Sequence, residues 1–174
     1  GIELFFSKKY KNAIPKVNIH NPDINVIGWL GGTHCIISLD CSKSSLHKRG
    51  YRHTVISAPL SETLACAILK FAGYDGNQAL LDPMCGSGTI PIEAGMMALN
   101  IAPLKFREFR EFGFCHFKFF NEEEFRYIKK ILEKRELKTL KYKIYGSDIN
   151  TQCIKVAKIN AKKAGLSSHL LFKT

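Results

Sequence analysis

The pattern of hydrophobic and polar positions near the N-terminus predicts a β-hairpin. Two β-rich runs, Ile24 to Leu30 and His34 to Asp40, are separated by three residues, of which two are glycine. This spacing is typical of antiparallel strands joined by a tight turn. Nothing before the first run completes a sheet, so residues 1–42 are expected to be the end of a module that began upstream. Residues 43–56 are polar, basic and broken by glycine, which is the composition of a connector.

Beyond residue 56 the pattern changes to helices that alternate with short apolar runs. Helical periodicity covers residues 57–71, 89–100, 121–137 and 150–164, and the apolar runs between these segments cover residues 79–82, 143–149 and 169–173. Asn121, followed by three glutamates, is a strong helix start because a side-chain cap and acids both favour that end of a helix. The order predicts an α/β fold for residues 57–174: a partial Rossmann-like parallel sheet with helices on its faces. Ligands of such sheets bind at the carboxyl ends of the strands.

A glycine loop follows the first of these apolar runs. The sequence DPMCGSGTI, residues 82–90, contains the first two glycines of the dinucleotide-binding fingerprint, but Pro91 stands at the third glycine position. No phosphate-loop Gly-Lys-Ser/Thr occurs. Gly86 and Gly88 either serve only a tight strand-to-helix turn or let a nucleoside approach bare backbone without a pyrophosphate. The apolar strand before them, the buried helix after them and an acid closing the next strand favour the nucleoside, and S-adenosylmethionine is the common ligand with that need.

Two acids close the predicted strands beside this loop. Asp148 lies at the end of the second strand, where its carboxylate can accept hydrogen bonds from both hydroxyls of a ribose. Charged hydrogen bonds of this kind contribute about 1.5–3 kcal/mol each. Asp82 is expected to orient the loop and the amino group of the methionine. The alternative for Asp148 is a helix-capping role, which Asn150 or Thr151 can also take.

Composition narrows the class of partner. The formal net charge is +11, and the excess lies in the flanks: +5 for residues 1–60 and +7 for residues 121–174, against −1 for residues 61–120. This distribution suits a small-molecule pocket beside a surface that meets a polyanion, although a lysine-rich solvated face gives the same count. The six cysteines have neither zinc-ligand spacing nor the pattern of a disulfide framework. The cysteine spacing therefore predicts no metal site. No apolar run approaches the ~20 residues of a membrane-spanning helix, so a cytoplasmic protein is expected.

Four motifs occur in the order typical of one family. They are SLHKRGYR from residue 45, APLSETLA from residue 58, DPMCGSGTIPIEAGMMALNIAP from residue 82 and GSDINTQCIKVAKINAKKAG from residue 146. Together they closely resemble the THUMP-associated RNA guanine-N2 methyltransferases, especially the bacterial type that modifies 23S ribosomal RNA. The resemblance implies a class I methyltransferase fold, preceded by the end of a THUMP-type α+β RNA-binding module. It also implies S-adenosylmethionine as methyl donor and the exocyclic N2 of a guanine in RNA as acceptor.

The resemblance assigns roles to particular residues. The cofactor loop would consist of Asp82, Pro83, Cys85, Gly86, Ser87 and Gly88. The segment expected to lie over the cofactor is Ala58, Pro59 and Leu60. Asp148 would hold the adenosine ribose. In the basic connector, Lys48, Arg49 and Arg52 are expected to contact RNA phosphates, because arginines in such a segment have few alternatives in a core.

An insertion typical of the family separates Asp82 from Asp148. Residues 105–120, within it, hold seven of the twelve phenylalanines, interleaved with basic residues. One interpretation is a surface that stacks on bases or grips RNA. The favoured interpretation is an aromatic face that lies on the methyltransferase core.

The acceptor half of the expected active site is missing from these residues. In the family an Asn/Asp-Pro-Pro-Tyr loop holds the guanine amine, and this sequence has no two adjacent prolines. We therefore expect no catalytic residue here, and a fragment, cut at both ends, that binds cofactor weakly and does not turn over. Three alternatives stay open: a transfer-RNA guanine-N2 methyltransferase, a DNA adenine-N6 methylase that shares the cofactor half, or a non-catalytic RNA-binding or assembly protein with a methyltransferase-like domain.

Overall fold

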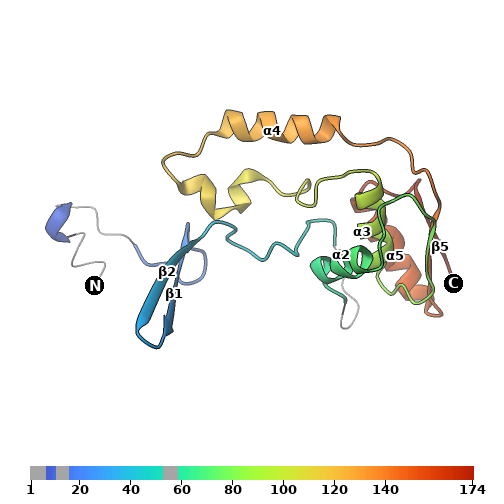
Figure 1. Cartoon of the computed structure of the whole chain (residues 1–174), viewed down its shortest axis with the longest axis horizontal. Helices are drawn as coiled ribbons and strands as arrows, with labels where there is room; N and C mark the ends of the chain where they lie inside the picture. The colour runs from blue at the N-terminus through green and yellow to red at the C-terminus, as the bar shows by residue number, and fades with distance from the viewer. Residues whose placement is uncertain (1–6, 11–15, 53–58) are drawn as a thin grey trace.

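Figure 1 shows a β-hairpin at one end of the molecule and a small sheet with its helices at the other. The structure, a computed structural model, describes residues 7–10, 16–52 and 59–174. A long helix, α4 (Glu122–Lys134), runs along one side of the molecule between the two ends. No helix within the described ranges is long and apolar enough to cross a membrane.

The predicted hairpin is present. Strand β1 (Asn25–Gly31) pairs antiparallel with β2 (His34–Asp40), and the turn between them uses the positive φ of 55° at Gly32. Its apolar side chains remain largely exposed, including Trp29 at 57% and Leu30 at 81%. The hairpin therefore buries little apolar surface within the described part of the chain.

The predicted parallel sheet is also present. Strands β3 (Leu80–Asp82), β4 (Ile144–Ser147) and β5 (Leu170–Lys173) lie in the order β3-β4-β5. Because successive strands advance in one direction, right-handed crossovers place the connecting helices on one face. On the other face, Leu81 and Leu171 are 66% and 45% exposed. The predicted parallel sheet with flanking helices is therefore confirmed, with the helices on one face of the sheet among the described residues.

Three helices build the core against the covered face of the sheet. They are α2 (Glu62–Phe71), α3 (Thr89–Ala98) and α5 (Thr151–Lys163). Helices α3 and α5 pack on the sheet, α2 packs on α3, and the core includes Ile92, Ile144 and Leu166. Ser61 caps α2, so Pro59 and Leu60 precede the helix, whereas the sequence predicted Pro59 in its first turn. Residues 57 and 58, predicted in the same helix, lie outside the described residues. Asn121 and Asn150 cap α4 and α5 as expected.

The phenylalanine-rich insertion forms two short 3-10 helices, η1 (Phe109–Glu111) and η2 (Gly113–His116), beneath α4. Its rings contact one another and Phe125 of α4, with centroids 5.0–6.5 Å apart. Phe106 packs against the main core. The favoured interpretation is therefore confirmed for Phe106, whereas these other rings form a separate aromatic cluster under α4.

Candidate functional site

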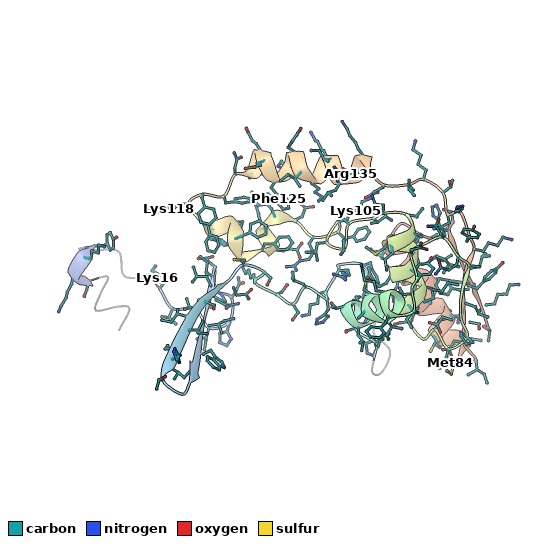
Figure 2. The ribbon with its side chains drawn as sticks, in the orientation of Figure 1. Lys16, Met84, Lys105, Lys118, Phe125 and Arg135 are labelled. Carbon is teal, nitrogen blue, oxygen red and sulfur yellow. The ribbon has the colours of Figure 1, made fainter. Side chains whose placement is uncertain are left out.

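A pocket of about 620 Å³ lies at the carboxyl ends of β3 and β4. Seven of the nine predicted cofactor residues line it: Pro59, Leu60, Asp82, Cys85, Gly86, Ser87 and Asp148. Residues that the sequence did not assign to the cofactor complete the lining: Met84, Thr89, Ile90, Asn150 and Cys153. Met84, labelled in Figure 2, is 83% exposed beside the sheet. The fold therefore gathers residues from three separate segments, 59–60, 82–90 and 148–153, at the edge where a parallel sheet binds its ligands.

The glycine loop is tied to the carboxyl end of β4 by two hydrogen bonds. Cys85 donates its backbone N–H to the carbonyl of Ser147 at 2.9 Å, and Gly86 donates to Asp148 Oδ2, also at 2.9 Å. Gly86 has a φ of +53°, a conformation that costs other residues about 1–2 kcal/mol. A Cβ built there would meet no atom within 4 Å. Bare backbone at Gly86 thus faces open space in the pocket.

Gly88 and Pro83, which the sequence also predicted for the cofactor loop, do not line the pocket. Gly88 is the N-cap of α3 with a φ of +81°, and a Cβ there would lie 3.0 Å from Ala157 Cβ and 3.2 Å from the Phe172 ring. Glycine is required at this position because the start of α3 packs closely on α5 and β5. Pro83 is exposed at the turn after β3.

Two carboxylates dominate the charge of the pocket. Asp82 Oδ1 accepts a hydrogen bond from the Met84 N–H at 3.1 Å, and Asp148 Oδ1 accepts one from the Asn150 N–H at 2.9 Å. Burial raises the pKa of the Asp82 carboxyl; the Met84 hydrogen bond opposes this, and the charge of Asp148 adds to it. No lysine or arginine is among the described residues that line the pocket. The site therefore suits a ligand with positive charge and hydroxyl donors, and disfavours a phosphate.

The two thiols in the pocket are held in the neutral form. Burial raises the pKa of the Cys85 thiol to about 12, helped by the charges of Asp82 and Asp148. The pKa of Cys153 is also raised, by burial first and then by Asp148. A thiol with a raised pKa is a poor nucleophile, so these cysteines contribute shape to the pocket.

The connector arginines are used inside the fold. Arg49 is 8% exposed, and its Nε lies 3.6 Å from Glu93 Oε2 in α3. Arg52 Nε lies 3.4 Å from Glu62 Oε1, and its side chain is 14% exposed. Their guanidinium groups face internal carboxylates, which argues against the predicted phosphate contacts of Arg49 and Arg52. Lys48 is exposed and remains a candidate for such a contact.

Glu93 is a buried acid that the sequence analysis missed. It is 1% exposed, and Tyr51 Oη and Cys66 Sγ each donate a hydrogen bond to it at 2.8 Å. Together with Arg49, these groups neutralise and satisfy the carboxylate, which a buried acid requires. A single acid within the otherwise apolar run of α3 was the signal for it.

Asn160 and Gly146 support the glycine loop and were also missed. Asn160 of α5, 1% exposed, donates from Nδ2 to the Ser87 carbonyl at 3.1 Å. A Cβ at Gly146 would lie 2.7 Å from the Phe172 ring and 3.1 Å from Cys85 Sγ, so only glycine fits. A polar residue on the apolar stripe of α5 was the signal for Asn160.

The fold and the site together indicate which class of protein this is. Among solved structures, SMU.472, described as a methyltransferase and complexed with SAH, matches with a TM-score of 0.79 and 28% identity, over 88% of this chain and 39% of that chain. A predicted N6-adenine-specific DNA methylase from Listeria monocytogenes matches with a TM-score of 0.73 and 36% identity, over 79% of this chain and 36% of that chain. The architecture is a class I methyltransferase fold.

The family follows from the sequence. Residues 49–174 match the family UPF0020, described as the RMKL-like methyltransferase domain, and the chain belongs to it. The Ribosomal RNA large subunit methyltransferase K/L of Psychromonas ingrahamii is 42% identical over 168 residues, which are 95% of this chain and 22% of that protein. The chain thus spans less than a quarter of the length of this relative.

Proposed function

We propose that these residues form the cofactor-binding half of an S-adenosylmethionine-dependent RNA methyltransferase. The observation that carries the proposal is the pocket in which Asp82, Asp148 and the bare backbone of Gly86 converge. Its chemistry matches a cationic nucleoside and does not match a phosphate. The homologous methyltransferase complexed with SAH has the same fold.

The residues present fit S-adenosylmethionine group by group. Asp148 accepts the backbone N–H groups of Gly86 and Asn150, and an ionised carboxylate has about four lone-pair sites, so acceptor sites remain for ribose hydroxyls. The Asp82 carboxylate would attract the ammonium and the sulfonium of the methionine half. Pro59 and Leu60 would cover the bound cofactor from the connector side. The cofactor, when bound, supplies the electrophilic methyl group.

The proposed acceptor is the exocyclic N2 of a guanine in 23S ribosomal RNA. The name of the Psychromonas relative supports a large-subunit ribosomal RNA, and the net charge of +11 suits a polyanion. Residues 1–42 would be the end of a THUMP-type RNA-binding module, 43–56 the connector and 57–174 the methyltransferase part, and Lys48 would contact a phosphate. Such an enzyme would act in the cytoplasm. Its groups that align the guanine amine are not among these residues, so no catalytic residue is assigned.

A second acceptor is favoured by one observation. The structural relative from Listeria monocytogenes is described as an N6-adenine-specific DNA methylase, at 36% identity. Because the cofactor half is shared between amine methylases of both kinds, the pocket does not separate them. The acceptor in this alternative is the exocyclic amine of an adenine in DNA.

The proposal is tested by titrating the chain with SAH by calorimetry and by competing 23S ribosomal RNA against duplex DNA for binding. We expect saturable SAH binding and preference for the RNA. A folded chain that does not bind SAH would overturn the proposal, and preference for DNA would support the adenine alternative. A methyl-transfer assay on unmodified RNA is expected to be negative; robust turnover would show that the acceptor groups lie within these residues after all.

A further inference from the structure

Arg52 joins three parts of the cofactor half through one guanidinium group. Its Nη2 donates to the Leu60 carbonyl at 2.7 Å and to Thr89 Oγ1 at 2.8 Å. Its Nε lies 3.4 Å from Glu62 Oε1 in the first turn of α2. One side chain from the connector therefore contacts the segment before α2, the start of α2 and the start of α3.

Two of these partners line the candidate cofactor pocket. Leu60 belongs to the segment that borders the pocket before α2, and Thr89 is the first residue of α3 on another side. Nη2 has two hydrogens, one for each acceptor, so a single nitrogen holds the two walls of the pocket together. Because Thr89 Oγ1 accepts from Arg52, its own hydrogen points elsewhere, and Ser87 Oγ lies at 3.4 Å. Arg52 thus also restricts the orientation of a hydroxyl at the pocket.

The ion pair with Glu62 fixes Arg52 in this place. Glu62 is 2% exposed, and neither Arg52 Nε nor Glu62 Oε2 has a hydrogen-bond partner among the described residues. Charge attraction without directed hydrogen bonds holds this pair, and burying two such groups carries a desolvation cost. A pair of this kind is weak support for stability, so its value lies in where it places the guanidinium.

We propose that Arg52 is a positioning residue of the cofactor pocket. By holding Leu60 against Thr89 it sets the width of the pocket and the direction of the Thr89 hydroxyl, and so sets cofactor affinity from the connector. This inference rests on the proposed function for the identity of the ligand. Lysine cannot replace arginine here, because its single nitrogen cannot both reach Leu60 and Thr89, as Nη2 does, and face Glu62, as Nε does.

Tyr51, the neighbour of Arg52, provides a matched control. It is 1% exposed and docks the same connector on α3 through Glu93, but it does not line the pocket. Tyr51→Phe therefore removes a buried connector hydrogen bond without touching the pocket walls. Any effect of connector docking alone on cofactor binding will appear in both variants.

The experiment measures the Kd for SAH by calorimetry and the Tm for the wild-type chain, Arg52→Gln, Arg52→Lys and Tyr51→Phe. We expect Arg52→Gln to weaken SAH binding about tenfold or more, and Arg52→Lys several-fold with a Tm near that of the wild type. Tyr51→Phe is expected to lower the Tm while Kd stays within about twofold of the wild type.

The outcomes separate this inference from the proposed function. A wild-type chain that folds but does not bind SAH contradicts the proposed function. If the wild type binds and both Arg52 variants bind equally well, or if Tyr51→Phe loses as much affinity as Arg52→Gln, positioning by Arg52 is disproved. Should Arg52→Gln fail to fold, Arg52→Lys decides: lost affinity at an unchanged Tm supports the inference, and unchanged affinity overturns it.

Discussion

Gly86 donates its backbone N–H to Asp148 Oδ2 at 2.9 Å, although the two residues are 62 positions apart in the sequence. The carboxylate at the end of β4 therefore holds the glycine loop that follows β3. Asp148 Oδ1 accepts a second hydrogen bond from the Asn150 N–H at the start of α5. One side chain thus fixes the loop and the next helix start while it also lines the pocket.

Replacing Asp148 with Asn is expected to weaken SAH binding by about 10- to 100-fold, because charge-assisted hydrogen bonds contribute about 1.5–3 kcal/mol. The amide would also present a donor to the N–H of Gly86 or to a ribose hydroxyl. Calorimetric titration measures the effect. Asp75→Asn is the matched control, since Asp75 is exposed and its carboxylate accepts from Asn77 in a surface turn. Equal affinities in the two variants would remove Asp148 from the cofactor site.

Replacing Gly86 with Ala is expected to cost about 1–2 kcal/mol of folding stability, because its φ is +53°. The added methyl group would also occupy the open space where the ligand approaches the loop. Gly165→Ala provides the control: its φ is +70° and its Cβ would also meet no atom within 4 Å, but it follows α5 away from the pocket. Chemical denaturation should show similar losses in both variants, and only Gly86→Ala should lose affinity for SAH. Similar affinity in both would mean that the ligand does not approach Gly86.

Cofactor affinity is expected to decrease when the pH is lowered through the pKa of Asp82, which is raised in the folded chain. Because burial raises this pKa in the folded chain, the ionised carboxylate costs stability at neutral pH, and that cost is relieved as pH falls through the folded pKa. A cationic cofactor needs the ionised form. The Kd for S-adenosylmethionine should therefore increase on acidification, starting above the usual Asp value of about 3.9. In Asp82→Asn this part of the pH profile should be flat; an unaltered profile would assign the titration to another group.

Local signals were sufficient to predict most of the elements and the convergence at the pocket. Asn121 and Asn150 cap helices that begin where the sequence places them, because capping depends on neighbouring residues alone. Asp82 and Asp148 meet because parallel strands bring their carboxyl ends to one edge. That the gathered residues hold a cofactor stays a prediction.

The connector shows where local reasoning fails. The sequence predicted that Arg49 and Arg52 are surface cations, because their neighbours along the chain are polar and basic. Their partners, Glu93 and Glu62, lie 44 and 10 positions further along the chain, and only the packing of the connector against α2 and α3 brings them together. A buried acid in an apolar helix implies a distant cation, but it does not name which one.

Gly146 connects strand packing to the glycine loop, and its replacement by Ala is expected to destabilise the fold by about 1–3 kcal/mol. The new methyl group would lie 2.7 Å from the ring of Phe172, which is buried, and 3.1 Å from Cys85 Sγ in the loop. Neither neighbour can move without disturbing β5 or the pocket. Gly28→Ala in the exposed strand β1 is the control, because a Cβ there meets nothing within 4 Å. Denaturation with urea should show a reduced midpoint for Gly146→Ala and an unchanged or higher one for Gly28→Ala. Equal midpoints would mean that the Phe172 ring relaxes freely and that close packing at Gly146 does not position the loop.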